Sequence, residues 1–249
     1  MIPIATSGAV LRAPKASERL ARLIVRDISA GGFGPGDALE SELAMMRRYN
    51  SSRESLREAL RLLEVQGMLT IRRGPHGGPV VGTVDPASLG RIGALFYHLA
   101  GATYDELFDA WVFGESALAR MAAKHPDPDI RSTAMAPYLD GSHGQEEDLA
   151  RFVEDHEGFH GAVASLAGNR VLELSLRAFG QLVAHHVATV GDPRSMGETL
   201  THDHGRIAAS IADGYHRGAE ELMAAHLRDV CDLNRSMLGE LVRGKVEWL

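Results

Sequence analysis

The spacing of hydrophobic residues divides the chain into two unlike parts. In roughly the first third, apolar positions recur at helical intervals in three short stretches, and two short apolar or β-branched runs then flank a glycine-rich tip. The expected elements are helices over 17–29, 41–48 and 52–66, and strands over 68–71 and 80–81. The order helix, helix, turn, helix, hairpin is that of a winged helix-turn-helix.

The remainder of the chain shows no strand-like alternation. Long amphipathic stretches are separated there by glycine, proline and asparagine, which predicts six or seven helices. These stretches cover about 87–101, 103–124, 145–167, 170–190, 197–214 and 216–242. We therefore expect a mainly α protein with two domains: a winged helix-turn-helix over 14–82 with a small β-hairpin wing, and an all-helical bundle over 87–245.

Charge is distributed unevenly between these two parts. The whole chain has a net charge of −7, yet residues 1–82 contain 12 Lys and Arg against 8 Asp and Glu, a net of +4. The remaining residues contain 14 against 25, a net of −11. A basic N-terminal part can bind phosphates even in an acidic protein, because binding depends on the local field. Chance unevenness of charge is the alternative.

Composition favours a cytoplasmic protein over a membrane or secreted one. The chain is 45% hydrophobic and 24% charged, and it has no apolar run long enough to form a membrane helix. We find no signal-peptide pattern at the N-terminus. Cys231 is the only cysteine, which rules out an intrachain disulfide and fits a reducing compartment. We therefore expect a cytoplasmic protein.

The helix expected over 52–66 has the chemistry of a DNA-reading helix. Arg53 and Arg57 are four residues apart, so they share one face, opposite the apolar positions. The planar guanidinium of arginine suits both phosphate oxygens and the O6 and N7 atoms of guanine. The alternative is a solvated face on which Glu54 and Glu58 pair with these arginines.

The expected hairpin favours the DNA-reading interpretation over that alternative. Arg72, Arg73 and His76 lie near its tip beside Gly77, and such a basic wing can reach a minor groove or the backbone. Short hydroxyl donors also lie at the start of the preceding helix. Those donors are Ser52 and Ser55.

Three segments together resemble the DNA-binding domain of GntR-type bacterial repressors. They read "GPGDALESE", "NSSRESLREALRLLEVQGML" and "RRGPHGGPVV". The resemblance implies that Arg53, Arg57 and the wing around His76 and Gly77 contact DNA. The chain departs from the family pattern at Leu43, where an arginine is common, so one usual DNA contact is missing.

Four histidines of the second part are candidate metal ligands. His156 and His160 are separated by one helical turn, and His204 and His226 lie on the two helices expected last. Imidazoles from three packed helices can hold a divalent ion, and Zn and Ni are the candidates. The alternative is that they are polar-face or singly hydrogen-bonded core histidines.

A second resemblance concerns these histidines. The stretches "FVEDHEGFHGAVASLAGNR" and "HDHGRIAASIADGYHRGAEELMAAHL" resemble the helical FCD effector domain of the FadR subfamily of GntR regulators. The resemblance implies a divalent metal that helps bind a small effector, often one that bears a carboxylate. His156 stands where the family usually has an aspartate ligand, so we expect a site rich in histidine.

Two residues of the second part are candidate effector contacts. The family often has paired arginines where this chain has Trp111 and Val112, and Asn169 lies in a matching Gly-Asn turn. Trp111 and Asn169 are therefore the candidate effector contacts, although a tryptophan on a packed helix is commonly a core residue. If Trp111 lines the pocket, the effector is bulkier or more apolar than a small dicarboxylate.

The sequence as a whole predicts a homodimeric repressor that binds a pseudo-palindromic operator and a small-molecule effector. One alternative is a metal-responsive regulator, in which the ion itself is the signal. The other is a metal-dependent hydrolase, which is not favoured because the chain contains no His-Glu-x-x-His motif and no evident general base. We therefore expect no enzymatic activity and no membrane partner.

Overall fold

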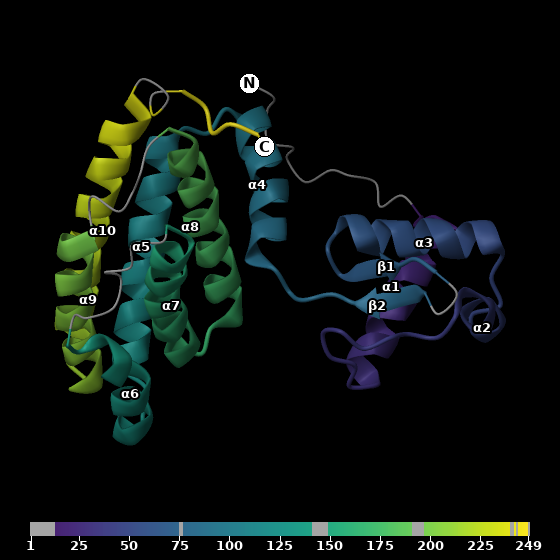
Figure 1. The fold of residues 1–249 in the computed structure, drawn as a ribbon, viewed down its shortest axis with the longest axis horizontal. Helices are drawn as coiled ribbons and strands as arrows, with labels where there is room; N and C mark the ends of the chain where they lie inside the picture. The colour runs from purple at the N-terminus through teal and green to yellow at the C-terminus, as the bar shows by residue number, and fades with distance from the viewer. Residues whose placement is uncertain are drawn as a thin grey trace. The chain divides into compact units, whose positions relative to one another are not determined.

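The computed structural model describes residues 13–74, 77–140, 149–190, 197–239, 242 and 244–248. The chain forms two compact units, one ending at Ser88 and the other beginning at Leu89. We call the first unit the head and the second the body. Figure 1 shows the elements of each unit.

The head consists of three helices and a two-stranded antiparallel hairpin. Its elements are α1 (Ala16–Ala30), α2 (Glu42–Arg48), α3 (Arg53–Val65), β1 (Leu69–Arg72) and β2 (Gly78–Val81). In the hairpin, Leu69 lies opposite Val81 and Arg72 lies opposite Gly78. The core forms between α1, α2, α3 and β1 and includes Leu20, Ile24, Met45, Leu56, Leu63 and Leu69.

Helix α3 begins at a well-formed cap. The Ser52 side chain accepts a hydrogen bond from the Ser55 backbone N–H at 3.2 Å, which satisfies one of the unpaired donors of the first turn. The buried residues Leu56, Ala59 and Leu60 then attach one face of the helix to the core. The opposite face is left to solvent.

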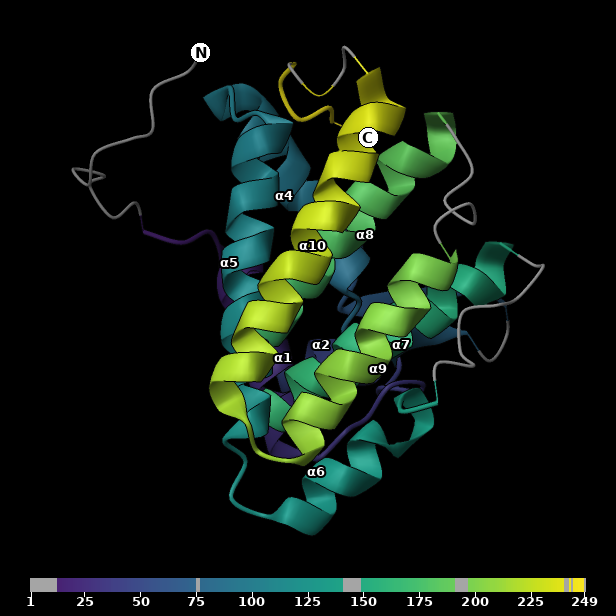
Figure 2. The ribbon, with the colours of Figure 1, turned by 90° about the vertical axis from the view of Figure 1, so that its left-hand side faces the viewer.

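The body is an all-helical bundle. Its helices are α4 (Pro86–Ala100), α5 (Tyr104–Ala123), α6 (Pro128–Met135), α7 (Leu149–Ala167), α8 (Arg170–Val190), α9 (Gly197–Ala212) and α10 (His216–Leu238), with a short 3-10 turn, η1 (Ala136–Tyr138). Helix α5 packs against α7, α8, α9 and α10. Figure 2 shows α10 running along the bundle beside α5. The bundle core includes Phe108, Leu118, Phe159, Ile207, Met223 and Leu227.

The C-terminal segment returns to the start of the bundle (Figure 1). Val246 is fully buried, and its backbone N–H donates to the Ala102 carbonyl at 2.8 Å. Its carbonyl lies 3.0 Å from Nδ1 of His98. The last residues of the chain therefore tie the end of α4 to the beginning of α5.

The expected fold class is confirmed: the protein is mainly helical, with a helix-turn-helix and hairpin followed by a helical bundle. Helix α6 was not predicted, because Pro126 and Pro128 read as a break. Instead Asp127 caps this helix through Asp129 N–H at 2.9 Å, and Pro128 occupies its first turn, where proline is tolerated. Within the described residues, no helix is long and apolar enough to cross a membrane.

Candidate nucleic-acid interface and candidate metal centre

The solvent face of α3 presents two arginines. Arg53 and Arg57 are both exposed and lie one helical turn apart, beside the apolar face that buries Leu56 and Leu60. Within the part of the chain that the structure describes, neither arginine forms an ion pair, so the expected alternative, pairing with Glu54 and Glu58, is not found there. Their guanidinium groups are available for phosphates or base edges.

The serines at the start of α3 serve the helix itself. Ser52 caps the helix, and its hydroxyl lies 3.0 Å from the hydroxyl of Ser55. Both side chains retain hydrogen-bonding capacity, because a hydroxyl has one donor and two acceptor positions. They are therefore structural residues that can also reach a bound backbone.

The wing places further positive charge in the same unit. Arg72 and Arg73 are exposed at the end of β1. Gly77 donates its N–H to the Gly74 carbonyl at 2.9 Å, and a Cβ at Gly77 would overlap the backbone carbonyl of Arg72. Only glycine fits this tight tip. The predicted contact His76 lies outside the described residues.

Helix α2 lacks one cation that the GntR pattern would place there. Leu43 stands 54% exposed where the family commonly has an arginine. Arg48 pairs with Asp27 at 3.1 Å and with Glu40 at 3.6 Å. The exposed cations of α3 and the wing are therefore the main candidates for phosphate binding.

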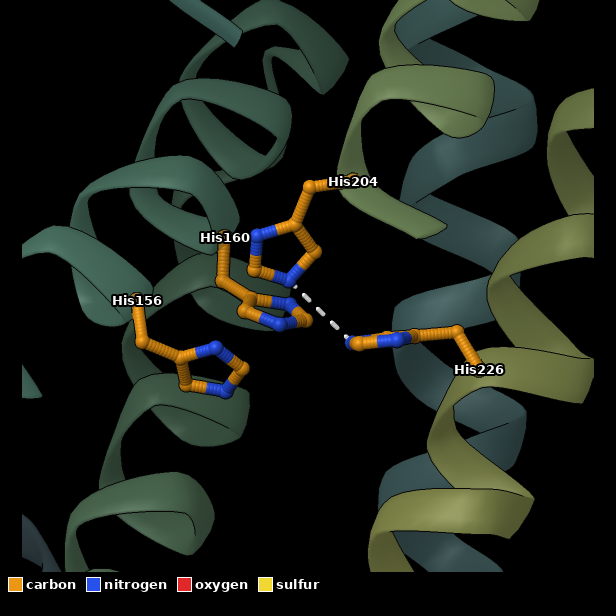
Figure 3. Close-up of side chains that lie close together, drawn as sticks. All are labelled: His156, His160, His204 and His226. Atoms are coloured by element: carbon orange, nitrogen blue, oxygen red, sulfur yellow. Dashed lines mark hydrogen bonds between the residues drawn. The ribbon is translucent and has the colours of Figure 1, made fainter. Parts of the chain in front are cut away.

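The body brings the four predicted histidines together (Figure 3). His156 and His160 come from α7, His204 from α9 and His226 from α10, and one nitrogen from each lies within 4.8 Å of the others. The Nε2 atoms of His204 and His226 are 3.2 Å apart. Three helices therefore aim four imidazoles at one point.

Three of the four histidines of this cluster are buried, and His156 is partly exposed. His160 is 7% exposed, while His204 and His226 are each 1% exposed. Phe159 stacks on His204 with ring centroids 4.0 Å apart. Burial lowers the pKa of His226, with Asp203 partly offsetting the effect, so this ring is neutral near pH 7. Neutral imidazole is the form that binds metals.

Two carboxylates contact Nδ1 atoms of the clustered histidines. Glu115 of α5 is 2% exposed, and its Oε2 atom lies 3.2 Å from Nδ1 of His160. Asp203 lies 3.6 Å from Nδ1 of His226, longer than an ordinary hydrogen bond. Carboxylates in such positions orient metal-binding histidines and raise their basicity.

The donor set fits a divalent metal of the zinc or nickel type. With Nδ1 of His160 held by Glu115, its buried Nε2 has no hydrogen-bond partner among the described residues. A metal–nitrogen bond of about 2.0–2.1 Å places two tetrahedral ligands roughly 3.3 Å apart, close to the 3.2 Å between His204 and His226. Imidazole donors suit Zn and Ni better than Mg or Ca.

The two candidate effector contacts occupy different surroundings. Trp111 is 6% exposed in the core of the body, where its ring lies against Gly180 of α8. Asn169 caps α8, its side-chain oxygen accepting from the Leu172 N–H at 3.2 Å. It lies beyond the C-terminal end of α7, nine positions after His160. Their roles in effector binding stay predictions.

Sequence reasoning missed both supporting carboxylates. Glu115 precedes His160 by 45 positions and lies on another helix, so no local spacing connects them. Asp203 is adjacent in sequence to His204, yet it faces His226. The sequence did contain one signal for Glu115, because it is the only charged residue in an otherwise largely apolar stretch of α5.

Together the two units define a class of protein, in which a winged helix-turn-helix precedes an all-helical body. The family model "Bacterial regulatory proteins, gntR family" matches residues 16–75, and the FCD domain model matches residues 106–229. The chain belongs to the GntR family and carries an FCD domain, a combination consistent with the FadR-type subfamily.

Curated relatives share part of their length with this chain. The HTH-type transcriptional repressor NanR of Salmonella newport is 28% identical over 176 residues, which cover 68% of this chain and 66% of the relative. NanR of Salmonella bongori is 27% identical over the same shares. The alignment thus spans slightly less than two thirds of these relatives. These relatives and the GntR family are described as transcription regulators rather than enzymes.

A solved structure has the same fold. Streptococcus agalactiae GntR superposes with a TM-score of 0.61 at 18% identity, covering 87% of this chain and 99% of that one. At this identity the likeness concerns the fold alone.

Proposed function

We propose that the protein is a transcription repressor that binds operator DNA as a homodimer. The observation that carries the proposal is the exposed face of α3, where Arg53 and Arg57 point to solvent in the same unit as a basic wing. The repressor function of the NanR relatives supports repression. The operator is then a pseudo-palindrome read by two heads, and the protein acts in the cytoplasm, where the DNA is.

The body is the sensor in this proposal. The histidines His156, His160, His204 and His226 hold a divalent ion, with Zn or Ni as the candidates. Such an ion supplies positive charge that attracts an anionic ligand, and a carboxylate-bearing metabolite is the expected effector. Effector binding and operator binding are coupled, because each shifts the conformations available to the other.

Operator binding tests the DNA-reading part. DNA fragments selected in vitro from a random library supply the probe, and fluorescence anisotropy gives the affinity. Arg53→Ala should weaken binding by roughly 1–3 kcal/mol, because one guanidinium contact is lost. Arg217→Ala, an equal charge change at an exposed site on α10, should leave the affinity unchanged. Equal effects of the two variants would count against α3 as the reading helix.

Metal content tests the sensor part. Elemental analysis of the purified protein should find near-stoichiometric metal, and His204→Ala should reduce it strongly while the protein keeps its fold. His185→Ala, at an exposed histidine of α8, is the matched control. Full metal occupancy in His204→Ala would refute the ligand assignment.

The same preparation separates two kinds of signal. If metal alone changes operator affinity in the absence of metabolites, the ion is the signal. If affinity responds only when a carboxylate ligand is added to the metal-loaded protein, the metal is a fixed part of the effector site. Both are measured by titrating the labelled operator.

A further inference from the structure

Helix α4 carries a stripe of large apolar side chains that the chain leaves exposed. Exposed fractions along it are 47% for Leu89, 43% for Ile92, 65% for Phe96 and 42% for Leu99. Their spacing of three, four and three residues places them on one face of the helix, as in the seam of a coiled coil. We call these four residues the α4 stripe.

The other face of α4 is already occupied. Ala94 is fully buried, and a Cβ at Gly90 would come within 3.0 Å of the Ala178 carbonyl on α8. Tyr97 packs edge-to-face on Phe179 at 6.1 Å. Small residues thus bring α4 close to α8, and the large residues face away from that contact.

Helix α4 as a whole has the composition of a buried helix. Of its 15 residues, Arg91 is the only one with a permanent charge, whereas surface helices carry a polar face. A helix that is apolar on both faces is normally covered on both. A contiguous exposed apolar stripe is typical of an interaction site.

Charge identifies the partner as a second copy of the chain. Residues after 82 have a net charge of −11, so two bodies repel one another over most of their surfaces. Among the body's described α-helices, α4 alone contains no acidic residue. Two copies can therefore meet along α4 without facing carboxylates, and the stripe of one then matches the stripe of the other.

The hollow between α5 and α10 is the rival surface. Phe113 is 79% exposed there, but charged residues line the same hollow, among them Asp109, Glu221, Arg228 and Asp232. A second copy seated in it would have to bury these charges, at a considerable desolvation cost. The α4 stripe imposes no such cost.

We infer that the α4 stripe is the core of the homodimer interface, with α4 of one copy packed on α4 of its partner. The inference rests on the proposed function, which requires two copies of the chain. It adds the surface that joins them. Because α4 directly follows the DNA-binding head in sequence, pairing at this helix links the two heads through short connections.

Charge introduced into the stripe tests the inference. Ile92→Glu/Phe96→Glu should raise the dimer dissociation constant roughly 100-fold or more, because two unpaired carboxylates per copy would be buried. Light scattering after size exclusion measures the mass. Phe113→Glu, at a more exposed phenylalanine, should leave the dimer intact. Circular dichroism and metal uptake verify that the body is folded, and the milder Phe96→Ala/Leu99→Ala replaces the double glutamate variant if that one does not fold.

The outcomes are distinct. Loss of the dimer in the stripe variants, but not in Phe113→Glu, supports the interface. A dimer that persists in the stripe variants, a dimer lost only in Phe113→Glu, or a wild-type protein that is monomeric at micromolar concentration overturns it. Operator binding measured on the same samples separates the two proposals. Wild-type protein that dimerises through the stripe but binds no DNA would overturn the repressor and leave the interface standing.

Discussion

At the scale of single residues, Glu115 orients the ring of His160, one of the four candidate metal ligands. Its carboxylate lies 3.2 Å from Nδ1 of His160, which leaves Nε2 to face the other histidines. Glu115→Gln keeps the shape but removes the charge, so zinc affinity should fall about tenfold. Competition against a chromophoric chelator measures this change.

The control for Glu115 is another glutamate of the body. Glu220 pairs with Arg120 at 3.2 Å in a half-exposed ion pair. Glu220→Gln should leave zinc affinity unchanged. If both variants lost affinity equally, the effect would be one of overall charge rather than of the contact with His160.

His186 predicts a pH dependence of stability. Its Nδ1 atom lies 2.9 Å from the Tyr104 hydroxyl, and burial, with a smaller contribution from His185, lowers the pKa of His186 below 6.5. The unfolded chain therefore binds a proton at a higher pH than the folded protein does. The stability contributed by neutral His186 is complete above pH 6.5 and declines as the pH falls toward its folded-state pKa.

His186→Gln isolates this effect, because the other histidines are common to both proteins. The difference in free energy of unfolding between wild type and variant should shrink as the pH falls below 6.5. Urea unfolding followed by tryptophan fluorescence reports on the body, because both tryptophans lie after residue 88. A difference that stays constant with pH would contradict the assignment.

At this scale the sequence predicts some contacts and not others. His156 and His160 share one helix, so the helical repeat alone brings them together. The contact of Glu115 with His160 depends on how α5 packs against α7, which no local pattern encodes. Asn169 illustrates the converse, since its place in a familiar motif did not reveal that its side chain caps α8.

At the scale of elements, the wing depends on one glycine. A Cβ at Gly77 would overlap the Arg72 carbonyl, so Gly77→Ala must displace the backbone of Arg72 and Arg73. We expect operator affinity to fall by at least about 1 kcal/mol while the body stays intact.

The wing variant has a control in the same unit. At Gly34 an added Cβ would meet only the Asp37 carboxylate at 3.8 Å, an ordinary contact, so Gly34→Ala should bind the operator normally. Because both tryptophans lie after residue 88, tryptophan fluorescence monitors the body, and circular dichroism adds the head. Normal binding by Gly77→Ala would remove the wing from the interface.

Elements with strong local signals were predicted well. Helix α3 has a serine cap and a regular apolar face, and the structure places it over Arg53–Val65. Helix α6 was missed because its prolines resemble a loop. What distinguishes it is the aspartate directly before Pro128, since a capping residue followed by proline marks a helix start.

At the scale of the whole molecule, the uneven charge predicts how operator binding responds to salt. Each head exposes Arg53, Arg57, Arg72 and Arg73, so a dimer can neutralise up to about eight phosphates. Affinity should then fall roughly 10³–10⁵-fold between low and physiological salt, because bound cations are released from the DNA. Titrations at several salt concentrations give the slope, and a flat response would argue against phosphate binding.

Hydrophobic periodicity changes character near residue 85, and the described chain forms two units, one ending at Ser88 and the other beginning at Leu89. The packing of the helices was not predictable. His204 and His226 meet only because α9 and α10 lie against each other, a contact between segments that the sequence shows merely as neighbours. Long-range packing of this kind also sets which helix is left with an uncovered face.

The path of the C-terminal segment has a consequence for protein synthesis. All elements of the head precede Ser88, so a nascent chain can complete the head's core while the ribosome is still translating the body. The body cannot complete its packing until its C-terminal part has been made. His98 contacts Val246, 148 positions later, and α5 packs against α10. A premature stop codon near the end of the gene would therefore yield a finished DNA-binding head attached to a bundle that cannot close.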